Sequence, residues 1–125
     1  MSEIIWISER AARAIHSQQL ALFGGAEGIL DPGKLSSALA RPRHLHTYKP
    51  NASLYQLAAA YCWGVAKNHP FVDGNKRTAF VVMAAFLQVN GIELTAPEAE
   101  VVTTMLAVAA GEMSEEQIGA WLQRT

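Results

Sequence analysis

His69-Pro-Phe-Val-Asp-Gly-Asn-Lys-Arg-Thr78 is a polar stretch between two apolar ones, and this contrast decides the expected fold. A mostly apolar segment, residues 54–66, precedes it, and nine consecutive apolar residues, 79–87, follow it. Apolar runs of this kind favour buried helices. We therefore expect a short polar loop between two buried helices, which is a favourable place for a functional site.

The loop residues predict where the two helices end and begin. Pro70 disfavours the α region for His69 and so ends the incoming helix, while Asp73-Gly74 is a turn pair. Asn75 is of a type that accepts hydrogen bonds from the first free N–H groups of a helix. We therefore expect Asn75 to be the N-cap of the outgoing helix.

Two cations, Lys76 and Arg77, fall in the first turn of that helix, where the helix dipole is already positive. They cost about 0.3–1 kcal/mol each if exposed, so the pattern indicates an anion, most naturally a phosphate, at the helix N-terminus. Gly74 lets backbone amides approach that anion closely. Asp73 is then a candidate ligand for a divalent metal ion on the same phosphate, and His69 is a candidate general base for a hydroxyl nucleophile.

The same stretch resembles the motif of the Fic superfamily, and Asp73-Gly-Asn-Lys-Arg-Thr-Ala79 resembles its death-on-curing (Doc) branch, the toxins of toxin–antitoxin pairs. The resemblance covers nearly the whole chain and implies one Fic/Doc-like domain over residues 1–125. It continues through Trp6-Ile-Ser, Ile15-His, Phe23-Gly-Gly, Ala38-Leu-Ala-Arg-Pro42, Leu54-Tyr-Gln-Leu-Ala58 and Asn90-Gly91.

The resemblance also implies a reaction and its residues. A phosphoryl or nucleotidyl group passes from ATP to a hydroxyl of a target protein, with His69 as the base and Asp73 as the Mg²⁺ ligand. The anion hole is formed by Gly74, Asn75, Lys76 and Arg77. Phe71 is expected to point into the core and anchor the loop.

Two positions favour the Doc branch over the AMP-transferring Fic proteins. Where the latter carry a second glycine and a final arginine, this chain has Lys76 and Phe80, as Doc toxins do. Doc toxins transfer the γ-phosphate, and their target is elongation factor Tu, so phosphoryl transfer to a Ser or Thr of such a translation factor is implied. Gly74 and Pro70 are Fic-like choices, so AMP transfer stays open. Two non-catalytic interpretations also stay open. One is a buried polar network that only holds two helices together, and the other is a module that binds nucleotide or antitoxin without turnover.

Capping signals elsewhere predict an all-α fold of about six helices with a short flap. The expected helices cover residues 8–23, 31–42, 53–68, 75–90, 97–111 and a last short one from residue 114, where Ser114-Glu-Glu-Gln117 is a capping box. In the first helix Ala11, Ile15 and Leu22 are expected on the buried stripe. His16 is expected to be a structural histidine, or one with a role near the site.

Residues 43–51 are predicted to be irregular, because Arg41-Pro42 should end the second helix. In the Fic superfamily the equivalent region is a flap that aligns the target segment by strand-like pairing. The resemblance therefore implies target docking at His46, Tyr48 and Lys49. A plain solvated loop is the alternative, since the spacing of the histidines is weak evidence for a metal site.

Composition limits the remaining function classes. The 125 residues are half hydrophobic and 17% charged, which suits one compact globular domain. A net charge of −1 gives no electrostatic footprint for nucleic acid or an anionic membrane, and the longest apolar run is far below the ~20 residues of a membrane span. The single Cys62 and the lack of a visible signal peptide favour a cytoplasmic location.

Control is expected to come from another chain. Fic proteins are often restrained by a helix with a Ser/Thr-x-x-x-Glu-Gly/Asn motif, which this sequence lacks. We expect instead a small antitoxin whose C-terminal segment folds as an amphipathic helix into an exposed apolar groove beside the motif.

Overall fold

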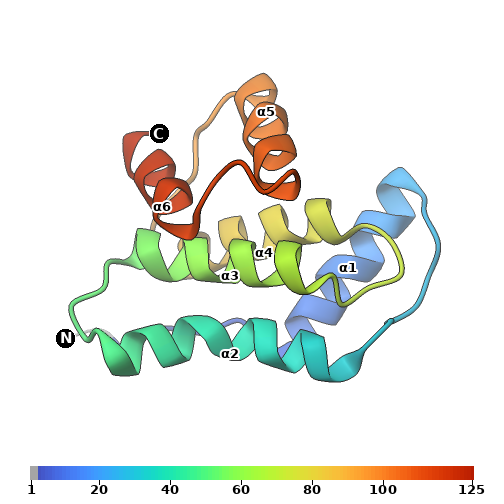
Figure 1. Cartoon of the computed structure of the whole chain (residues 1–125), viewed down its shortest axis with the longest axis horizontal. Coiled ribbons are helices and arrows are strands. Elements are labelled where there is room, and N and C mark those ends of the chain that lie inside the picture. The colour runs from blue at the N-terminus through green and yellow to red at the C-terminus, as the bar shows by residue number, and fades with distance from the viewer. Residues whose placement is uncertain (1–2) are drawn as a thin grey trace.

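The structure is a computed structural model that describes residues 3–125, and its six helices share one apolar core (Figure 1). The helices are α1 Glu9–Phe23, α2 Pro32–Tyr48, α3 Leu54–Asn68, α4 Asn75–Val89, α5 Glu98–Ala109 and α6 Glu115–Arg124. Over residues 3–125 the only extended pairing is a single antiparallel bridge between Ile29 and Phe71. The all-α prediction is confirmed, and no helix within this range is long and apolar enough to cross a membrane.

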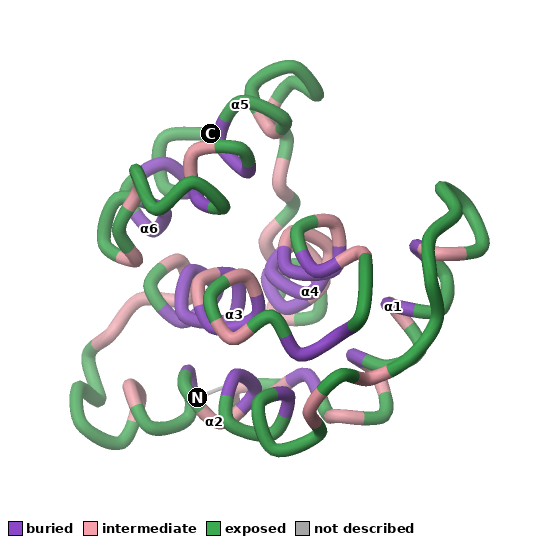
Figure 2. The backbone as a smooth tube through the Cα atoms, turned by 45° about the vertical axis from the view of Figure 1, so that its right-hand side comes forward, coloured by how far each residue is buried: buried purple, intermediate pink, exposed green. Residues whose placement is uncertain are grey.

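Helix α3 lies at the centre of the molecule beside α4. Residues 57–62 of α3 are buried without a break. Helix α2 covers one side of the α3–α4 pair, and α5 and α6 cover the other (Figures 1 and 2). Gly64 allows α2 to approach closely, because a Cβ there would lie 3.1 Å from the carbonyl oxygen of Ala38. The pair of buried helices predicted on either side of the polar loop is therefore the centre of the fold.

Local capping signals are confirmed at four helices. Ser8 accepts from the N–H of Ala11, and Asp31 caps α2 with Pro32 as its first residue. The helix expected from residue 53 begins with the cap Ser53, which forms a complete capping box with Gln56. The predicted capping box of Ser114 with Gln117 is also complete at α6.

The predicted end of the second helix at Pro42 is wrong, and with it the flap at residues 43–51. Helix α2 continues through Pro42 to Tyr48. Proline inside a helix costs about 3 kcal/mol, but here Pro42 is buried and Leu45 packs against the core, so packing outweighs that cost. His46 and Tyr48 are helical and Lys49 is the C-cap, at the end of α2 far from the polar loop (Figure 1).

The predicted stripe of the first helix is confirmed for Ala11 and Ile15, which are half-buried and pack against the core, but it is wrong for Leu22. The buried residues of α1 are Ala12, His16 and Gln19, whereas Leu22 is 64% exposed. His16 is buried because α1 packs against the motif loop as well as against the core. Apolar periodicity alone could not reveal this, since it assigns polar residues to the solvent side.

Candidate functional site

The polar loop begins with a strained residue. His69 is exposed and ends α3 with φ 53° and ψ 55°, and within residues 3–125 it is the one residue other than glycine with a positive φ. Pro70 does keep His69 out of the right-handed α region, as predicted, but the result is a left-handed rather than an extended conformation. Such a conformation costs about 1–2 kcal/mol for a residue with a side chain, and strain of this kind gathers at functional sites.

Asn75 does not cap α4 as predicted, because its side chain turns back to hold the loop. Its Oδ1 accepts from the N–H of Phe71 at 2.9 Å, and its Nδ2 donates to the carbonyl of Phe71 at 2.9 Å. Phe71 is fully buried, as expected of a core anchor. Gly74, with φ 77°, occupies the N-cap position, and α4 has no side-chain cap. The first-turn N–H groups of α4 are therefore left for another partner.

His16 of α1 supports the same loop from the other side. Its side chain is 5% exposed, and its Nε2 lies 2.8 Å from the carbonyl oxygen of Asp73. A carbonyl only accepts, so Nε2 carries the proton. The imidazole stacks on Phe71 with ring centroids 3.8 Å apart and planes 7° from parallel. His16 is therefore a buried structural histidine with its hydrogen bond made, and it also contacts the motif loop.

The Asp73 carboxylate is held by backbone donors. Oδ1 accepts from the N–H of Gly74 at 2.8 Å, and Oδ2 accepts from the N–H of Ala26 at 3.2 Å. These two bonds, the nearby Arg77 guanidinium and His16 keep the pKa of Asp73 below its usual range. The carboxylate is exposed and ionised at neutral pH, so it is available to a cation.

Residues 24–30, hereafter the 24–30 segment, lie along the loop. The N–H of Leu30 donates to Pro70 at 2.8 Å, and the N–H of Val72 donates to Gly28 at 3.1 Å. Arg77 Nη2 donates to the carbonyl of Gly24 at 3.0 Å. The sequence places Phe23-Gly-Gly at the end of the first expected helix and within the family resemblance, but it does not predict this pairing, because pairing between segments 40 residues apart leaves no local signal.

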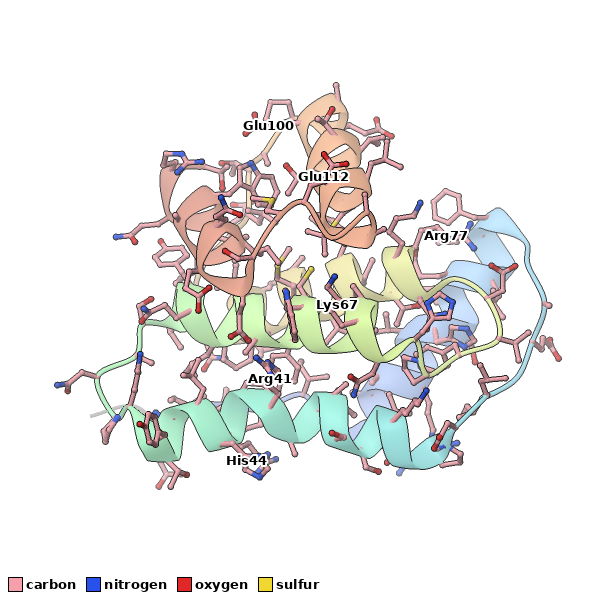
Figure 3. All side chains as sticks on the ribbon, in the orientation of Figure 1. Arg41, His44, Lys67, Arg77, Glu100 and Glu112 are labelled. Carbon is pink, nitrogen blue, oxygen red and sulfur yellow. The ribbon has the colours of Figure 1, made fainter. Side chains whose placement is uncertain are left out.

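An open cavity of about 680 Å³ lies between the 24–30 segment and the start of α4, and Arg77 is one of its lining residues. Figure 3 labels Arg77. Six of its lining residues come from the sequence prediction: His69, Asp73, Gly74, Asn75, Lys76 and Arg77. The other three, Phe23, Gly24 and Gly25, were not predicted. The structure does not bring His46, Tyr48 or Lys49 to this cavity.

The cavity suits a phosphate chain with one magnesium ion. Within residues 3–125 no three His, Cys, Asp or Glu side chains gather as a metal cage. Mg²⁺ commonly binds through one or two carboxylates together with substrate phosphates and water, so the single Asp73 is sufficient. The N-terminus of α4 has no side-chain cap and carries Lys76 and Arg77 in its first turn, so it offers donors of the kind that bind phosphates.

An apolar groove of about 500 Å³ adjoins the cavity between α1, α4 and α5. The two hollows share Phe23, Lys76 and Arg77. Four large apolar side chains of the groove are more than half exposed: Leu22, Phe23, Val102 and Leu106. An exposed apolar surface of this kind beside a site is typical of a place where another protein binds.

Comparison with known proteins relates the chain to a described family. A model of the Fic/DOC family matches residues 6–87. The chain is 31% identical over 119 residues to the protein kinase doc of Escherichia phage P1, which covers 94% of this chain and 93% of that protein. It is 41% identical over 75 residues to the toxin Doc of Mycolicibacterium smegmatis, covering 59% of this chain and 58% of that protein.

Proposed function

Because the chain belongs to the Fic/DOC family, we propose that it is the toxin of a toxin–antitoxin pair and transfers the γ-phosphate of ATP to a protein hydroxyl. The observation that carries the proposal is the cavity that collects His69, the ionised Asp73 and the uncapped, cationic N-terminus of α4. In phosphoryl transfer the protein positions the phosphates, neutralises their charge and activates the hydroxyl. The chain offers a group for each of these tasks.

In this proposal the N-terminus of α4 receives the phosphates. The backbone N–H of Asn75 donates to them, and Lys76 and Arg77 compensate their charge. Gly74 lets the phosphates approach closely because it has no side chain, while its own N–H stays with Asp73 Oδ1. Asn75 contributes only its backbone N–H, because its amide side chain is bonded to Phe71. Asp73 holds Mg²⁺, which neutralises charge on the phosphate oxygens when it is bound with ATP.

His69 is the proposed general base. As the target hydroxyl oxygen bonds to the γ-phosphorus, the bond from that phosphorus to ADP breaks and His69 takes the hydroxyl proton. His69 lines the cavity, and its backbone there is left-handed. A serine or threonine of a translation factor, with elongation factor Tu as the candidate, is the proposed acceptor, so the reaction belongs in the cytoplasm.

Transfer of the terminal phosphate is favoured over AMP transfer by two side chains. Lys76 adds a charge at the cavity where a glycine would leave the backbone open. Phe80 lines the apolar groove and is not among the residues that line the cavity, so position 80 offers no cation to the outer phosphates of a nucleotide bound in the other direction. AMP transfer remains the second candidate because Gly74 and Pro70 are the choices of AMP-transferring proteins.

Target docking is better placed on the 24–30 segment than on His46, Tyr48 and Lys49. That segment is not helical. It pairs with the motif loop, since the N–H of Leu30 donates to Pro70 and the N–H of Val72 donates to Gly28, and its Gly24 and Gly25 border the cavity. A flap that aligns a target by strand-like pairing has to lie beside the reacting groups. His46, Tyr48 and Lys49 lie at the C-terminal end of α2, away from the reacting groups.

The antitoxin is proposed to bind in the apolar groove through a C-terminal amphipathic helix. The four exposed apolar residues of the groove suit one face of such a helix. Because Lys76 and Arg77 border both hollows, a helix in the groove would also reach the edge of the cavity.

Growth arrest and its dependence on His69 test the proposal. Expression of the wild-type chain without antitoxin should arrest growth, and His69→Asn should abolish the arrest. Asparagine is the matched replacement, because it also tolerates the left-handed backbone but cannot act as a base. His69→Ala should lower transfer by about 10²–10⁴-fold as well.

Two results would contradict the proposal. Normal growth with soluble wild-type protein would argue against a toxin that has no internal restraint. Arrest by soluble His69→Asn at the wild-type level would exclude His69 as the base and favour a module that binds without turnover.

A further inference from the structure

We infer that His16 is a positioning residue for the reaction proposed above, on which this inference rests. It fixes the Asp73–Gly74 peptide, and through that peptide it sets the Asp73 carboxylate and the start of α4. His16 is not placed in the anion hole and does not line the cavity. Its effect on the site runs through the backbone of the loop.

The Asp73–Gly74 peptide is held at both of its polar ends. Its carbonyl accepts from His16 Nε2 at 2.8 Å, and its N–H donates to Asp73 Oδ1 at 2.8 Å. Gly74 has φ 77° and no Cβ, so nothing in its own side chain restricts rotation of this peptide. Rotation would carry the Gly74 N–H away from the carboxylate. The bond from His16 supplies the restriction that the glycine lacks.

The imidazole is itself fixed in direction. It is 5% exposed and stacked on the fully buried ring of Phe71. Phe71 is in turn held by both of its backbone bonds to the Asn75 side chain. The proton donor therefore cannot swing away from the Asp73 carbonyl without disturbing the anchor of the loop.

The next turn of α1 supports the same part of the site. A Cβ built on Gly25 would lie 2.9 Å from Leu20 Cδ2, and one on Gly74 would lie 3.4 Å from it. Helix α1 therefore contacts the loop with His16 and with Leu20. Asp73 and Gly74 pack against this face of α1.

Three variants separate the hydrogen bond from general packing. His16→Gln keeps an N–H donor, whereas His16→Leu keeps bulk without a donor. Tyr61→Phe is the matched control, because it removes another buried side chain-to-backbone bond, the 2.9 Å bond between Tyr61 and the N–H of Ile7, away from the loop. Each variant is measured by amide hydrogen exchange without nucleotide and by the Mg²⁺ concentration needed for half-maximal γ-phosphate transfer.

In His16→Leu, the amides of Gly74 and Ala26, which donate to the Asp73 carboxylate, should exchange at least about tenfold faster while the α3 core amides stay protected. Its Mg²⁺ requirement should rise by about 10–100-fold, the usual effect of losing a group that orients a metal ligand. His16→Gln should recover most of both properties. Tyr61→Phe should lose stability but keep wild-type values in both measurements.

Unchanged exchange and Mg²⁺ requirement in His16→Leu would overturn the inference. So would faster loop exchange with an unchanged Mg²⁺ requirement, which would make His16 merely structural. A His16→Gln variant as defective as His16→Leu would show that the hydrogen bond is not the operative contact. A wild-type chain that transfers no phosphate refutes the proposed function instead, and the exchange data then decide by themselves whether His16 holds the loop.

Discussion

Gly25 lies against the Asp73 carboxylate. A single methyl group added at Gly25 therefore tests whether γ-phosphate transfer depends on the position of that carboxylate. A Cβ at Gly25 would be 2.8 Å from Asp73 Oδ2 and 2.9 Å from Leu20 Cδ2. To restore an ordinary contact of 3.4 Å, the carboxylate must retreat by about 0.6 Å. Gly25 also has φ 129°, so alanine adds backbone strain of about 1–3 kcal/mol.

Gly91→Ala is the matched control for that strain. Gly91 has φ 89°, lies after α4, and has nothing within 4 Å of its Cβ position. Both alanine variants should lose about 1–3 kcal/mol of unfolding free energy in urea denaturation. Since a displacement of ~1 Å costs on the order of 10²-fold in rate, Gly25→Ala alone should also lose roughly tenfold in γ-phosphate transfer and need more Mg²⁺. Equal activity and equal Mg²⁺ requirement in the two variants would refute a role for the carboxylate position.

Four further predictions concern the fold, the pH dependence, the metal ligand and the groove. Gly64→Ala should lower the unfolding free energy by about 1–3 kcal/mol because its Cβ would press on the α2 backbone at 3.1 Å, whereas Gly119→Ala, with contacts no closer than 3.7 Å, should raise it by up to about 1 kcal/mol in urea denaturation. Burial raises the pKa of the Cys62 thiol in the folded chain from 9.0 to about 12, so between these pH values the unfolded chain loses this proton and the folded chain keeps it. The unfolding free energy should therefore fall as the pH rises from 9 to 12, and it should fall less in Cys62→Ala. Asp73→Asn should raise the Mg²⁺ concentration needed for transfer, and an unchanged titration would argue against Asp73 as the ligand. Leu106→Glu should still arrest growth but should escape rescue by the antitoxin; full rescue would place the antitoxin elsewhere.

The features that the sequence predicted best depend on neighbouring residues. Ser114 with Gln117 is a local pattern that predicted a capping box, and the box forms. The helix expected from residue 53 also begins there, with Ser53 as its cap. The six residues of the motif that line the cavity lie within one stretch of nine, so the fold needs only one loop to bring them together.

The features that the sequence missed depend on contacts between distant segments. Pro42 stays helical because burial of its ring and of Leu45 outweighs a local penalty. The Asn75 side chain does not cap α4 as predicted, because its amide group makes two hydrogen bonds with the backbone of Phe71. His16 reaches the loop across 57 positions of the chain, which no local pattern could indicate.

The most direct test of the central claim is the position of the phosphate that is transferred. Purified chain is incubated with Mg²⁺ and elongation factor Tu, in parallel with ATP labelled at the γ-phosphate and with ATP labelled at the α-phosphate. Phosphoryl transfer through Asp73, Lys76 and His69 predicts label on a serine or threonine of the target from the γ-labelled nucleotide alone. Label from the α-labelled nucleotide would identify an AMP-transferring enzyme and would contradict the assignment made from Lys76 and Phe80.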